Sequence, residues 1–135
     1  MLDLFVASSE EDIQRLALRP RATLGGSTYW FLYRYFVHAS LAPGDFSFLN
    51  LYEDTEIGGY QLRRLRAELE EALIDLSARP RTFPVFVGWS GGAQSAETED
   101  RQLVERSTVE RTVHELIQIL NEAEQAGHCI YAIGD

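Results

Sequence analysis

Two long stretches with leucine or valine at every third or fourth position most constrain how this chain can fold. The first covers residues 60–78 and the second residues 108–126. This spacing puts the apolar side chains on one face of an α-helix, so each stretch predicts an amphipathic helix packed against a core. Gly127 follows the second stretch and is a typical helix terminator. The apolar faces consist of Leu62, Leu65, Leu69, Leu73 and Leu76 in the first stretch and Val109, Val113, Leu116 and Leu120 in the second.

Shorter helix and strand signals occupy much of the remaining chain. A helix is predicted at residues 8–18, and its start has the same pattern as the start of the second long helix. In both, a serine precedes a glutamate by three residues, as in a capping box: Ser8 with Glu11, and Ser107 with Glu110. Strands are predicted at residues 2–7, 82–89, 101–106 and 128–133, where β-branched, aromatic or other apolar residues are enriched.

Length and composition fit one globular domain. A chain of 135 residues of which 45% are apolar can bury roughly two-thirds of the surface it would expose when unfolded. We therefore predict a single α+β domain over residues 1–135, with one small sheet. Two long helices, a shorter N-terminal helix and an aromatic buried segment complete the prediction.

The aromatic segment covers residues 27–40, and Arg34 is the one charged residue between Tyr29 and Val37. Its aromatic content is typical of a strand. Its length without a helix breaker, together with Ser27 as a good N-cap, favours a buried helix. We predict the helix.

This segment gives two alternatives for function. In a helix, Arg34 and His38 share a face, and Arg34 can hold a carboxylate or a phosphate. Residues 29–38 would then wall a pocket for a small ligand, in a binding domain or an enzyme. If Arg34 and His38 instead form the solvent-facing stripe of a core helix, they have no such role. The second alternative is a homodimer whose interface is this apolar segment.

Net charge and cysteine content restrict the classes of partner and compartment. With 21 acidic and 12 basic side chains, the chain has a net charge of −9, which disfavours nucleic acids and anionic membranes. It favours a basic protein partner, because opposite charges speed the encounter. The single cysteine, Cys129, cannot form an internal disulfide, and residues 1–12 lack the basic start of a signal peptide. We expect a cytoplasmic protein.

No motif for catalysis, metal binding or a cofactor emerges. The letters of residues 88–92 match a nucleophile elbow, but a polar acidic stretch follows where that motif requires a helix. The histidines, at positions 38, 114 and 128, have no metal-ligand spacing. Cys129 directly follows His128, so in a strand the two side chains point to opposite faces. We predict a protein that is not an enzyme and that has no cofactor.

Two stretches combine carboxylates with aromatic side chains and are candidate partner-binding sites. One covers residues 52–60 and the other residues 89–100. Aromatic anchors rimmed by charge are common in protein interfaces. The alternative for both stretches is a solvated loop without a partner. The candidate partner-binding residues are Tyr52, Glu53, Asp54, Glu56, Tyr60, Trp89, Glu97, Glu99 and Asp100.

Arg63, Arg64 and Arg66 stand at the start of the first long helix, where the helix dipole disfavours positive charge. A bend at the two glycines that precede this helix would fold the acidic residues 53–56 back over its first turn. We predict that these carboxylates partly neutralise the arginines, which makes a metal site among the carboxylates less favourable.

In size, acidic charge and domain type, the whole chain is similar to bacterial toxin-immunity proteins. Such proteins bind the active face of a toxin, which is often a basic nuclease or effector. The resemblance implies a non-enzymatic protein that binds and neutralises a basic protein partner. In this interpretation the acidic surface steers the encounter and Tyr52, Tyr60 and Trp89 supply anchors. The resemblance includes no shared motif and therefore carries no residue over from the family.

Overall fold

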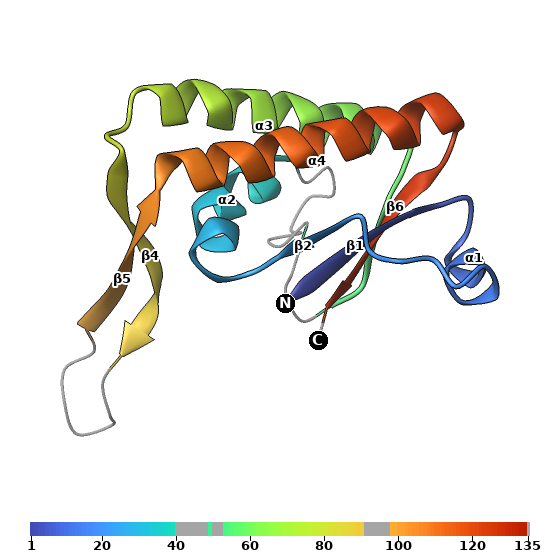
Figure 1. Cartoon of the computed structure of the whole chain (residues 1–135), viewed down its shortest axis with the longest axis horizontal. Coiled ribbons are helices and arrows are strands. Elements are labelled where there is room, and N and C mark those ends of the chain that lie inside the picture. Colours follow the sequence, from blue (N-terminus) through green and yellow to red (C-terminus); the bar gives the residue numbers. More distant parts are fainter. Residues whose placement is uncertain (40–48, 50–52, 91–97, 135) are drawn as a thin grey trace.

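An antiparallel sheet of four strands is covered on one face by long helices (Figure 1). The computed structural model describes residues 1–39, 49, 53–90 and 98–134. The elements form the single α+β domain that the sequence predicts. In chain order they are β1 (Leu2–Ala7), α1 (Glu10–Arg15), β2 (Ala22–Leu24), α2 (Gly26–Ala39), β3 (Thr55–Ile57), α3 (Tyr60–Ser77), β4 (Thr82–Ser90), β5 (Thr98–Glu105), α4 (Arg106–Ala126) and β6 (Cys129–Gly134).

The strand order in the four-stranded sheet is β2-β1-β6-β3, so β1 and β6 pair at its centre. Their register places Leu2 opposite Gly134 and Ala7 opposite Cys129. The three-residue strands β2 and β3 form the two edges. Sequence patterns miss both, because three residues are too few to show a periodicity and their pairing partners are distant in sequence.

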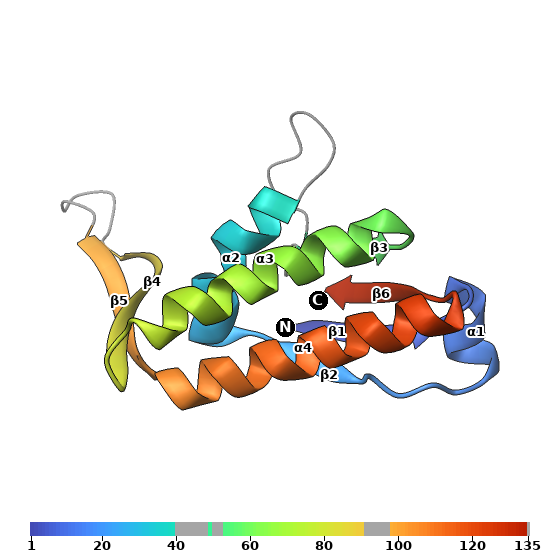
Figure 2. The same ribbon diagram turned by 90° about the horizontal axis from the view of Figure 1, so that it is seen from above.

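Strands β4 and β5 form a separate two-stranded sheet instead of joining the one small sheet that was predicted. Figure 2 shows this hairpin at one end of the molecule and α1 at the other. The base of the hairpin is anchored in the core, where Phe83 lies opposite Val104 and both side chains are buried. The register shifts between Phe86 and Gly88, which marks a β-bulge.

Helix α2 confirms the helix predicted for the aromatic segment. Its buried side chains include Tyr29, Leu32, Phe36 and Ala39, at steps of three and four residues. The hydroxyl of Tyr29 donates a hydrogen bond to the carbonyl oxygen of Leu49 at 2.6 Å, so this polar group is satisfied inside the core. These side chains therefore belong to the chain's own core.

The two predicted long helices are confirmed as α3 and α4, which lie side by side over the sheet (Figure 1). Their apolar faces are buried together, and β1, β3 and β6 supply the residues beneath them. Gly127 ends α4 in the left-handed conformation, with φ of 66°, as its position in the sequence predicts.

Neither predicted capping box forms. The hydroxyl of Ser8 donates to the carboxylate of Asp12 instead of accepting a bond from a backbone N–H. Strand β5 runs directly into α4, and the backbone N–H of Arg106 bonds to the carbonyl oxygen of Arg81 at 2.8 Å. Glu110 then pairs with Arg106 at 3.1 Å. Helix α4 therefore begins before the predicted serine, where no capping box can form.

The opposite face of the sheet carries a smaller apolar cluster beneath α1, which contains Phe5, Ile13 and Tyr131. Cys129 packs at the margin of this cluster. Burial raises the pKa of the Cys129 thiol, and a hydrogen bond with Glu56 raises it further. The thiol is therefore protonated near neutral pH, which fits a packing role for this side chain.

Gly58, between β3 and α3, gives a test of this packing. A Cβ atom at position 58 would lie 2.7 Å from the Cys129 sulfur. We expect Gly58→Ala to lower the free energy of unfolding by about 1–3 kcal/mol. Adding Cys129→Ala removes the sulfur, so the double variant should lose less stability than the sum of the two single losses. Urea unfolding measures all three variants.

Gly59 supplies the control. A Cβ atom there has open space around it, but φ is +57°, which strains any other residue. Gly59→Ala should therefore be destabilising whether or not Cys129 is present. Strict additivity of Gly58→Ala and Cys129→Ala would show that the sulfur does not limit space at position 58.

Candidate functional site

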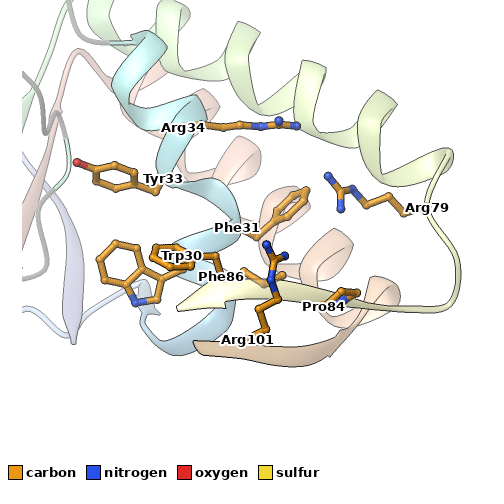
Figure 3. A pocket seen from close by; sticks show the side chains of 9 residues that line it. Trp30, Phe31, Tyr33, Arg34, Arg79, Pro84, Phe86 and Arg101 are labelled. Carbon is orange, nitrogen blue, oxygen red and sulfur yellow. The ribbon is translucent and has the colours of Figure 1, made fainter. Parts of the chain in front are cut away.

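One candidate site lies between α2 and the β4–β5 hairpin, in a cavity of about 370 Å³ (Figure 3). We call it the aromatic–arginine cavity. Its volume is within the range of small-molecule sites in proteins. The lining residues are Trp30, Phe31, Tyr33, Arg34, Arg79, Pro84, Val85, Phe86 and Arg101, and none of these is acidic.

Arg34 is held in place by two neighbours. Its guanidinium donates to the Tyr35 hydroxyl at 2.8 Å and to the Asp75 carboxylate on α3. Tyr35 donates its own hydroxyl hydrogen to Asp75. This bond and the charge of Arg34 hold the pKa of Asp75 below its ordinary value of 3.8. The carboxylate stays ionised at neutral pH and fixes Arg34 at the rim of the cavity.

Arg79 follows α3 and lies over two aromatic rings. Its guanidinium carbon is 5.1 Å from the ring centre of Phe31 and 4.8 Å from that of Phe83, which is cation–π geometry. Arg101 comes from β5, opposite Phe86 in the strand register. Three arginines from separate parts of the chain thus reach the same cavity, as Figure 3 shows.

The segment that was predicted to wall a pocket supplies part of the lining of this cavity. Trp30, Phe31 and Tyr33 line the cavity together with Arg34. His38 does not line the cavity. It lies one helical turn after Arg34, and its Nδ1 atom is 3.8 Å from a carboxylate oxygen of Glu68 on α3.

A second candidate site is the acidic edge of the four-stranded sheet, which we define as Glu10, Glu53, Asp54 and Glu56. All four are exposed. Glu10, Asp54 and Glu56 line a hollow of about 170 Å³ together with Tyr131. Asp54 accepts a hydrogen bond from the backbone N–H of Gly134 at 3.2 Å, which ties this carboxylate to the sheet.

The predicted neutralisation of the acidic residues by the nearby arginines is not observed. Arg66 bonds to Asn121 at 2.6 Å and pairs with Glu124 at 3.5 Å, both on α4. Arg64 donates to the carbonyl oxygen of His38 at 3.4 Å. Glu56 lies in β3, which pairs with β6, and Asp54 accepts a hydrogen bond from Gly134, so neither folds over the first turn of α3.

The predicted partner-binding residues do not form one surface. Tyr60 opens α3 and is 61% exposed. Asp100 lies on the β4–β5 hairpin, at the opposite end of the molecule from the acidic edge (Figure 2). Tyr52 and Glu97 lie outside the described residues, as do the side chains of Trp89 and Glu99.

Several residues of both candidate sites were missed by the sequence patterns. Glu10 and Tyr131 join the acidic edge only because α1 and β6 are next to β3 in the fold. Arg79 and Arg101 are 22 residues apart and meet only because the chain turns from α3 into the hairpin. The strand register, with Arg101 opposite Phe86, is the signal that would have linked them.

Within the described part of the chain, no group of three or more His, Cys, Asp or Glu side chains is arranged to hold a metal ion. None of the described helices has both the length and the apolar character needed to cross a bilayer. Comparison with protein-family models, curated proteins and solved structures finds no significant match to this chain.

Proposed function

We propose that this chain is a non-enzymatic binding module that binds and neutralises a basic protein partner, in the manner of a toxin-immunity protein. One observation carries the proposal: the acidic edge gathers four exposed carboxylates at one margin of the sheet. Among the described residues, none of these carboxylates forms an ion pair with a basic side chain. Their negative charge is therefore available to a partner.

Electrostatic attraction would act mainly on the rate of association. Exposed charge pairs add little affinity, because solvent and salt screen them. A concentrated negative surface on a protein of net charge −9 raises the rate at which a basic partner finds it. Affinity would then come from anchors such as Tyr60, which stands exposed at the start of α3, three residues after β3.

The test begins with capture of the partner by the immobilised protein from a lysate of the organism that encodes it. The captured protein is identified and purified, and its association rate is measured at about 50 and 200 mM salt. We expect the rate to fall with salt. We also expect Glu53→Gln, Asp54→Asn and Glu56→Gln, combined in one variant, to slow association at low salt by about tenfold.

A matched variant carries Glu70→Gln, Glu71→Gln and Glu115→Gln, which are exposed positions on α3 and α4. It changes the net charge by the same three units, so it separates the acidic edge from total charge. A failure to capture any basic protein, or equal rates for the two triple variants, would contradict the proposal.

A further inference from the structure

Helix α3 has an exposed face, here called the α3 face, that combines apolar, basic and acidic side chains. In Figure 1 this helix lies at the top of the molecule, on the side away from the four-stranded sheet. Two of the five exposed large hydrophobic side chains among the described residues belong to it, Tyr60 at 61% and Ile74 at 65%. The members of the α3 face, spaced by three or four residues or adjacent, are Tyr60, Arg63, Arg64, Ala67, Glu70, Glu71 and Ile74, and all are exposed.

The order of these residues is self-complementary. Ala67 stands at the centre, with two arginines three and four residues before it and two glutamates three and four residues after it. Tyr60 and Ile74 lie seven residues from Ala67 on either side. When two such helices pack antiparallel about a two-fold axis near Ala67, the arginine pair of each copy meets the glutamate pair of the other. A two-fold interface requires a surface that is complementary to itself in this way.

The charges of the α3 face are available for such pairing. Among the described residues, the side chains of Arg63, Glu70 and Glu71 have no ion pair or hydrogen bond. Arg64 donates one long hydrogen bond, to the carbonyl oxygen of His38 at 3.4 Å, which leaves its charge without a described counterion. Positive charge near the start of a helix is unfavourable. The glutamates of a second copy would supply the negative charge that the chain itself does not place there.

One half of the α3 face is hollow, with a volume of about 330 Å³. The hollow is lined by Tyr60, Arg63, Arg64, Ala67 and Glu68. The first four of these have the spacing i, i+3, i+4 and i+7, which is that of the hole that receives a side chain from a facing helix. The small side chain of Ala67 permits a close approach of two helix axes. In the antiparallel pair, Ile74 of the second copy lies beside Tyr60, at this hollow.

We propose that a second copy of this chain binds the α3 face, so that the protein forms a homodimer through an antiparallel pair of α3 helices. Arg63 of each copy faces Glu70 of the other, and Arg64 faces Glu71, which gives four charge pairs about one axis. A single helix from each copy makes a small interface, so we expect a dissociation constant on the order of 10–100 µM. Unfolding and association rates measured at about 1 µM protein then report on the monomer.

Sedimentation velocity over about 1–500 µM protein tests the self-association. We expect the mean sedimentation coefficient to rise with concentration from the value of a monomer toward that of a dimer. Arg63→Glu puts like charges opposite each other and should raise the dissociation constant by about tenfold or more. The matched control is Arg19→Glu, which makes the same change in net charge at an exposed position outside the α3 face and should change the constant by less than about twofold.

A charge-swapped pair of variants tests the interface directly. One variant carries Arg63→Glu and Arg64→Glu, and the other carries Glu70→Arg and Glu71→Arg. The α3 face of each variant then has charges of one sign, so each variant alone should stay monomeric. An equimolar mixture of the two should form a heterodimer. Both variants keep a negative net charge, so their association cannot come from an attraction between the whole molecules.

Three results would overturn the inference: a monomer at every concentration of the unsubstituted protein, equal effects of Arg63→Glu and Arg19→Glu, or a mixture of the swapped variants that stays monomeric. Circular dichroism checks that each variant keeps its helical content. Because the experiment uses no basic partner, its failure leaves the proposed partner binding untouched. Tyr60 is also an anchor proposed for that partner, so the monomer is the form that would bind it.

Discussion

Phe36→Ala is expected to lower the free energy of unfolding by about 3–5 kcal/mol. Phe36 is 0% exposed and belongs to the main core. It lines a small internal cavity together with side chains from β1, β3, α3, α4 and β6. Removing the ring therefore leaves a void at the point where these elements meet, and rigid neighbours on every side restrict its collapse. Urea denaturation gives the loss directly.

The control for this prediction is Ile74→Ala on α3. Ile74 is 65% exposed, so its truncation removes few packing contacts and should change stability by no more than about 0.5 kcal/mol. A small effect of Phe36→Ala would mean that the Phe36 ring is not packed where these elements meet. The m-value should stay constant, because both variants expose the same surface on unfolding.

The second large effect is expected on β5, where the same substitution should be costly at one residue and nearly neutral at its neighbour. Val104 is 7% exposed and lies opposite Phe83 in the core. Leu103 is 75% exposed. Val104→Asp buries a carboxylate without a partner and should cost about 3 kcal/mol or more. Leu103→Asp should be nearly neutral.

Thermal and urea unfolding of these two variants test the strand register directly. Successive side chains of a strand point to opposite faces, so a shift by one residue would exchange the two results. Comparable destabilisation by both substitutions would contradict the register of the hairpin and, with it, the position of Arg101 in the aromatic–arginine cavity.

The sequence predicts the long helices well because their stabilising pattern is local. Leu62, Leu65 and Leu69 repeat at helical spacing, and Gly127 marks where α4 ends. The aromatic segment was ambiguous for a physical reason, since aromatic residues favour strands while the absence of a breaker favours a helix. Burial on several sides, by α3 and β4 among others, settles it in favour of the helix.

The candidate sites were less predictable because their residues converge from distant parts of the chain. Arg34 was identified from its helix, but Arg79 and Arg101 could be placed beside it only with the hairpin in position. The arginines of α3 show the converse error. Glu56, one of the acidic residues expected to neutralise them, is held in the sheet by β6, and Arg66 pairs with Glu124 of α4 instead.

The pairing of β1 with β6 fixes the order in which this protein can fold during synthesis. Strand β1 is made well before its central partner β6, so the sheet cannot form until residues 129–134 have emerged. Helices α3 and α4, which contact each other directly, both precede β6 in the chain. The apolar faces of these helices should therefore stay exposed on the nascent chain until the sheet forms. The chain is most prone to aggregation during this interval.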